Sequence, residues 1–86
     1  MIKYQLNTNT LDLYNVMQQL DTIQKLFKPN IIFEITLSNI SHIDSAGIAF
    51  LLELKKIAIK INCTILFTEI PQKILVLCKL YDIILT

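Results

Sequence analysis

The 86-residue sequence contains one glycine, two prolines, one histidine and no tryptophan. With a single histidine, the chain is not expected to hold a metal through a histidine cluster. The two cysteines, Cys63 and Cys78, lie in apolar runs without CxxC spacing, and we interpret them as reduced core residues. No GxxxxGK[ST] loop occurs, so we do not expect the chain itself to bind ATP through a P-loop. We expect neither a metal nor a cofactor.

Charge is also scarce, since 17% of the residues are charged and the net charge is +1. Ordinary globular domains carry about 25% charged residues. The basic residues are scattered rather than interleaved with aromatics, which argues against nucleic acid as a partner. We find no paired acid and base and expect no enzyme activity; His42 is expected to cap a backbone group in a loop. Glu34 is expected to face solvent or to contact lysine side chains.

A long apolar run is missing as well. The longest candidate, Ile40 to Ile61, is interrupted by Asp44, Glu53 and three lysines, so it is not expected to span a bilayer. The first residues lack the apolar stretch of a signal peptide. We therefore expect a cytoplasmic protein without direct membrane insertion.

Apolar residues, in contrast, make up 53% of the chain. A chain of this length buries roughly 60–65% of the surface that its unfolded form exposes, which suits one domain over residues 1–86 with one core. Part of this apolar excess reflects a preference for isoleucine, and part indicates surface that only a partner covers, through which we expect the isolated protein to self-associate.

The periodicity of apolar residues predicts the element order β-α-β-α-β-α. An amphipathic helix over residues 11–28, capped by Thr10 and ended by Pro29, has an apolar face of Leu13, Val16, Met17, Leu20, Ile23 and Phe27. Strand-helix-strand units imply a small mixed or mainly parallel sheet with helices packed on it. Since three strands make a thin sheet, we expect a further partner strand or an open edge at the N-terminus. The expected elements are strands 2–6, 31–37 and 61–67, and helices 11–28, 45–61 and 72–81 with an uncapped apolar tail.

The second predicted helix has two apolar surfaces. Its broad face fits the sheet, whereas Ile48, Leu52 and Ile59 form a second apolar ribbon. That ribbon packs within the domain or joins a partner interface, and the sequence leaves both readings open. The broad face comprises Gly47, Phe50, Leu51, Leu54, Ile57, Ala58 and Ile61.

The start of this helix is the candidate site. Asp44 is a natural N-cap, and Ser45 then lies at the positive end of the helix dipole. Ala46 and Gly47 are expected to leave the first N–H groups accessible. A plain capped helix, an anion site, a phosphoacceptor at Ser45 and a contact platform all fit this pattern. The predicted partner-binding residues are Asp44, Ser45, Ala46, Gly47, Ile48, Ala49 and Leu52.

The segment from Ile40 to Leu51 resembles the signature of STAS domains, in which a buried strand and a short loop precede Asp-Ser/Thr-x-Gly at a helix start. STAS modules occur in anti-sigma-factor antagonists, sulfate transporters and related bacterial proteins. The resemblance implies an α/β, STAS-like (SpoIIAA-like) fold over nearly the whole chain.

Within that family, Ala46-Gly47-Ile48-Ala49 and the segment Lys79 to Asp82 look most like the STAS subunits of Mla-type phospholipid ABC transporters (the MlaB-like branch). This implies a non-catalytic, cytoplasmic subunit, peripheral to the inner membrane, that binds the transporter's ATPase and supports outer-membrane lipid asymmetry. Two features depart from this branch: the N-terminal hairpin is reduced to one strand, and a serine at Ser45 also fits anti-sigma-factor antagonists switched by phosphorylation. A lipid-binding module is a third reading, although a chain of this length leaves little room for a pocket of ~300 Å³.

Overall fold

Three short strands form an all-parallel sheet in the computed structural model, which describes residues 1–85. They are β1 (Ile2–Gln5), β3 (Ile32–Thr36) and β5 (Thr64–Thr68), in the order β1-β3-β5. In register, Tyr4 lies opposite Ile35, and Ile35 opposite Phe67. Side chains alternate between the two sheet faces along each strand, so these three point to the core side. The first two expected strands are thus confirmed, with ends shorter by one residue. The third is confirmed but shifted, since β5 begins three residues later and ends one residue later than expected.

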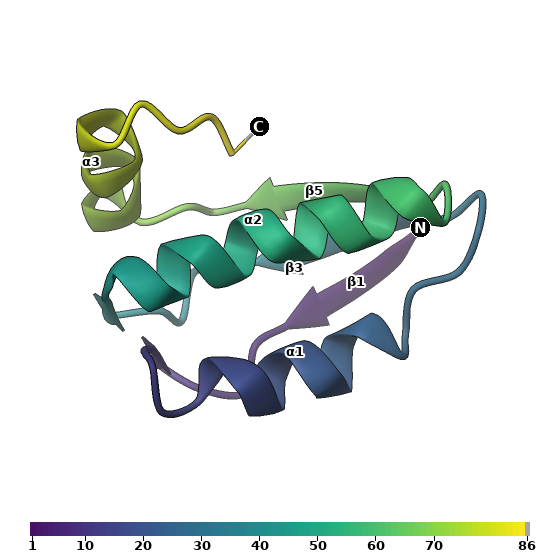
Figure 1. Cartoon of the computed structure of the whole chain (residues 1–86), viewed down its shortest axis with the longest axis horizontal. Helices are drawn as coiled ribbons and strands as arrows, with labels where there is room; N and C mark the ends of the chain where they lie inside the picture. The colour runs from purple at the N-terminus through teal and green to yellow at the C-terminus, as the bar shows by residue number, and fades with distance from the viewer. Residues whose placement is uncertain (86) are drawn as a thin grey trace.

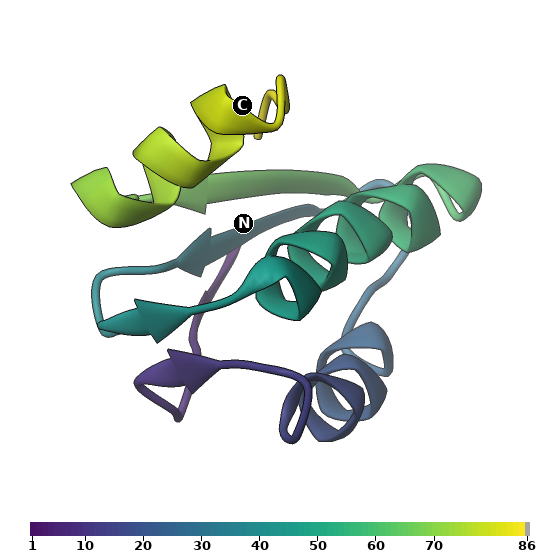
Figure 2. The same ribbon diagram turned by 60° about the vertical axis from the view of Figure 1, so that its left-hand side comes forward.

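The connections between parallel strands place helices against this sheet. α1 (Val16–Gln24) joins β1 to β3, α2 (Ser45–Lys60) joins β3 to β5, and α3 (Gln72–Leu80) follows β5. Figure 1 shows α2 lying across the sheet with α1 beside it, and Figure 2 shows both helices on the same side, with α3 beyond β5. The protein is therefore a small α/β domain with parallel sheets and packed helices, compatible with a STAS-like fold.

The core lies between the sheet and the helices. Phe33 and Ile35 from the central strand and Leu37 directly after it are fully buried, as are Leu51 and Leu54 from α2. The rings of Phe27 and Phe33 meet edge to face, with centroids 5.1 Å apart. Both cysteines are free and buried, which confirms them as core residues. Burial raises the pKa of the Cys78 thiol.

Where the sequence predicts loops, the structure has a second, two-stranded parallel sheet. β2 (Thr10–Leu11) pairs with β4 (His42–Ile43). Thr10 is therefore in a strand and does not cap a helix. His42 is also in a strand, and its backbone N–H donates to the Asn9 carbonyl oxygen at 3.2 Å. This pair is a sheet of its own and adds no strand to the larger sheet, so β1 forms the open edge that was the second of the two expected alternatives.

α1 is shorter than the apolar pattern predicts. Asp12 organises a turn in which its carboxylate accepts from the N–H of Tyr14 at 2.9 Å, and the helix begins only at Val16. Leu13 and Met17 are about 70% exposed instead of facing the core. Gln19 is buried in their place, and its amide donates to Asn7 Oδ1 at 3.1 Å. The expected apolar face was therefore wrong at its N-terminal end.

Two helices end in left-handed residues. Asn62 follows α2 with φ 60°, and Asp82 follows α3 with φ 56°. After α3, the N–H of Ile83 donates to the Cys78 carbonyl at 2.8 Å and that of Asp82 to the Lys79 carbonyl at 3.2 Å, the bond pair of a Schellman cap. The expectation of an uncapped tail was wrong, because the polar side chain of aspartate tolerates this conformation.

Candidate functional site

The small sheet fixes where α2 begins. The N–H of Asp44 donates to the Leu11 carbonyl at 3.2 Å, so the helix start continues directly from the β2–β4 pair. Asp44 itself is extended, and its Oδ1 accepts from the N–H of Gly47 at 3.0 Å. This is the predicted N-cap, and it satisfies one of the free donors of the first turn.

Gly47 is needed for packing and not to expose the helix tip. It is buried, and a Cβ built on it would lie 2.6 Å from Ile43 Cγ1 and would also collide with the Leu11 carbonyl. Its N–H is already bound by Asp44. The expectation that Gly47 leaves an accessible N–H was therefore wrong, since the glycine allows α2 to cross β2 at close range.

The remaining predicted site residues differ in exposure. Asp44, Ser45 and Ala49 are exposed, and Ala46 is half-buried. Ile48 is only 2% exposed and belongs to the core, whereas Ile59 is 73% exposed and Leu52 is half-buried. Ile48, Leu52 and Ile59 therefore do not form one exposed ribbon, because a single helix turns Ile48 into the core and Ile59 into solvent.

Two shallow apolar grooves flank the N-terminal half of α2. The first, which we call the tail groove, has a volume of about 230 Å³. The second, which we call the α1 groove, has a volume of about 280 Å³. Ala49 lines both, so the grooves run on either side of a ridge made by a small side chain. Figure 1 shows α2 lying between α1 and the segment that follows α3. The tail groove is lined by Ser45, Ile48, Ala49, Leu52, Tyr81 and Ile83, and the α1 groove by Val16, Met17, Leu20, Ala46, Ala49, Phe50 and Glu53.

The segment after α3 is held in place as one wall of the tail groove. The ammonium group of Lys55 donates to the Leu85 carbonyl at 3.2 Å, and the Leu85 side chain is buried. Together with the cap at Asp82, this contact positions Tyr81 and Ile83 beside α2. Tyr81 lines this groove and is exposed.

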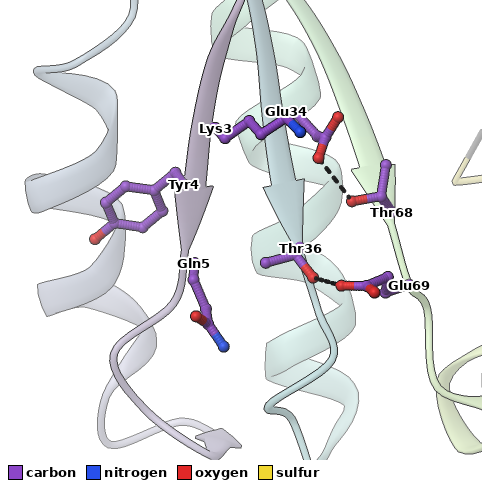
Figure 3. Close-up of a pocket in the computed structure, with 7 residues that line it drawn as sticks. All are labelled: Lys3, Tyr4, Gln5, Glu34, Thr36, Thr68 and Glu69. Carbon is purple, nitrogen blue, oxygen red and sulfur yellow. Dashed lines mark hydrogen bonds between the residues drawn. The ribbon is translucent and has the colours of Figure 1, made fainter.

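The opposite face of the larger sheet carries a polar crevice of about 510 Å³. Figure 3 shows that its side chains come from all three strands and from the turn after β5. Thr68 donates to Glu34 Oε2 at 3.4 Å, and Thr36 donates to Glu69 Oε2 at 2.7 Å. Glu34 thus lies on the solvent face, as expected. Both carboxylates in this crevice are thus hydrogen-bonded to threonine hydroxyls.

Other reactive chemistry is sparse in residues 1–85. No three His, Cys, Asp or Glu side chains gather in a way that could hold a metal ion. His42 has an exposed side chain at the outer end of β4. No helix in this part of the chain is long and apolar enough to cross a membrane. The arrangement of the described residues is suited to binding through apolar contact.

Neither the models of known protein families nor the curated protein sequences give a match to this chain.

Sequence reasoning found the helix tip but missed both groove walls. Met17 and Leu20 were assigned to a core face of α1, and Tyr81 and Ile83 to a helix end and a free tail. A signal existed at Asp82, because an Asp directly after a helical pattern can adopt the left-handed cap that turns the chain back. The pairing of β2 with β4 left no such signal, since two-residue strands are too short to show alternation.

Proposed function

We propose that the chain is a non-catalytic STAS-type subunit that docks onto the ATPase of an Mla-type phospholipid ABC transporter. In this proposal it acts in the cytoplasm, peripheral to the inner membrane, and supports a transporter that maintains outer-membrane lipid asymmetry. The docking surface consists of the start of α2, with Asp44, Ser45, Ala46 and Ala49, together with the two grooves beside it.

One observation carries the proposal. The motif Asp44-Ser45-Ala46-Gly47 starts a helix whose exposed side is small and is bordered on both sides by apolar surface. Apolar surface next to small residues permits close approach of another protein, and interface cores are depleted in charge. The resemblance of the segment Ile40 to Leu51 to STAS signatures then supports the choice of partner.

Co-purification tests the proposal. The chain is expressed with an affinity tag together with the ABC ATPase encoded beside it, and the expected result is a stable complex. Ala49→Arg places a long charged side chain on the ridge, and we expect it to weaken this complex by at least about tenfold, or 1.4 kcal/mol. Ile59→Arg changes an exposed residue almost three turns further along α2 and serves as the matched control.

The expected outcome for the control is unchanged binding with an unchanged melting temperature. If the wild-type chain retains no ATPase under conditions in which it is folded, the transporter assignment is wrong.

A second candidate function rests on the exposure of Ser45 at the first position of α2. As an anti-sigma-factor antagonist, the chain would be switched by phosphorylation of this hydroxyl. A phosphate adds a charge of about −1.5 to −2, which the helix dipole tolerates but an apolar docking partner does not. Incubation with a cognate serine kinase and ATP, followed by mass spectrometry, separates the two functions. Stoichiometric phosphate on Ser45 and loss of kinase binding would favour the antagonist.

A further inference from the structure

The shape of the docking surface restricts what can cover it. The tail groove and the α1 groove lie on opposite flanks of α2 and share one lining residue, Ala49, on the helix surface between them. A segment seated in both grooves therefore needs two apolar rows on one side that straddle Ala49. A helix can present such rows, since side chains three and four residues apart lie on one side of it, with ≈ 5–6 Å between Cβ atoms. In an extended strand, successive side chains point to opposite faces instead.

The charge around the grooves also restricts the occupant. Glu53 is the charged side chain that lines them, and it is exposed at the edge of the α1 groove. Within residues 1–85 the ion pair formed is Lys25 with Asp21, at 3.3 Å, so Glu53 has no cation of its own chain. Lys55 is directed to the Leu85 carbonyl on the other side of α2. A basic side chain of the occupant can pair with Glu53, in competition with Lys56 three residues along α2.

We propose that both grooves are filled by a single amphipathic helix of the partner. Its two apolar ridges straddle Ala49, one row entering each groove, and a lysine or arginine beside those rows pairs with Glu53. Ridges that pack into grooves in this way bring helix axes to 8–10 Å, and a small residue on the ridge suits the shorter distance. The inference deepens the proposed function, on which it rests, by defining the part of the ATPase that is recognised.

Photocrosslinking within the complex tests the geometry. A photoreactive phenylalanine analogue is placed at Met17, in the α1 groove, and separately at Leu52, in the tail groove. The crosslinked peptides of the partner are then identified by mass spectrometry. We expect both positions to capture the same partner helix, at residues three, four or seven apart. Capture of two unconnected segments, or of an extended strand, would overturn the inference.

The proposed contact between Glu53 and a basic residue of the partner is tested by measuring binding affinity at low and high salt. Glu53→Lys is expected to weaken binding by about tenfold at low salt, and the loss should shrink at high salt because the contact is exposed. Glu53→Gln should give a smaller loss, and Ile59→Lys, outside both grooves, should leave the affinity within about twofold. An equal effect of Glu53→Lys and Ile59→Lys would refute the contact.

These outcomes separate this inference from the proposed function. If both photoreactive positions capture one helix of a protein other than an ATPase, the helix inference stands and the transporter assignment falls. If the two positions capture the ATPase through segments that do not belong to one helix, the transporter assignment stands and the helix inference falls. If neither position captures a partner in cells, both are wrong.

Discussion

At Gly47 the lack of a side chain decides how closely α2 approaches β2. Alanine is normally better than glycine inside a helix by about 1 kcal/mol. Here a methyl group would collide with Leu11 and Ile43, so we expect Gly47→Ala to lower the free energy of unfolding by about 1–3 kcal/mol. Urea denaturation measures this change. Ala49→Ser, on the exposed side of the same helix, should stay within about 0.5 kcal/mol of the parent. A Gly47→Ala protein more stable than the parent would show that the two elements are not in contact.

The buried thiol of Cys78 predicts a dependence of stability on alkaline pH. Desolvation raises its pKa in the folded state above the value of 9.0 for a free thiol. The unfolded chain therefore loses this proton first, and the contribution of Cys78 to stability is fully present below 9.0. It is lost as the pH rises from there through the folded pKa. The check is the unfolding free energy of the parent minus that of Cys78→Ala across this range. A difference that does not fall with pH would contradict the prediction.

At the scale of the element, two hydrogen bonds of Asp44 hold the start of α2. Its side chain caps the helix, and its backbone N–H donates to the Leu11 carbonyl of β2. Asp44→Ala removes the acceptor for the Gly47 N–H and should cost about 1 kcal/mol of stability. Asp44→Asn keeps a side-chain acceptor and should cost only a few tenths of a kcal/mol. Chemical denaturation of the three proteins measures both. If Asp44→Ala and Asp44→Asn lose the same stability, the negative charge and not the hydrogen bond stabilises the helix tip.

The individual elements also show how much of the fold can be predicted from the sequence alone. β3 and α2 were predicted within one or two residues, because a β-branched run and an N-cap are local signals. The start of α1 was not, since Asp12 bonds to the backbone of a turn that competes with the helical pattern of Leu13 and Met17. The same distinction holds for the candidate site. The start of α2 could be predicted from its local capping pattern. The groove walls could not, because they depend on where the tertiary fold places α1 and the segment after α3.

On the scale of the whole molecule, the helices that connect the strands leave one face of the larger sheet open. All-parallel sheets usually have both faces covered. Here both α1 and α2 lie on one side (Figure 2), and the polar crevice occupies the other. Leu66 is 44% exposed on that outer face, and the next residue, Phe67, is buried in the core.

This asymmetry predicts opposite costs for two adjacent positions in β5. Leu66→Thr places a β-branched residue on the open face and should change the free energy of unfolding by no more than about 0.5 kcal/mol. Phe67→Ala removes a core ring, and losses of this kind are about 3–5 kcal/mol. Urea denaturation of both variants gives the comparison. A loss of several kcal/mol at Leu66 in the isolated chain would mean that self-association covers the outer face, and the dependence of stability on protein concentration would then reveal it.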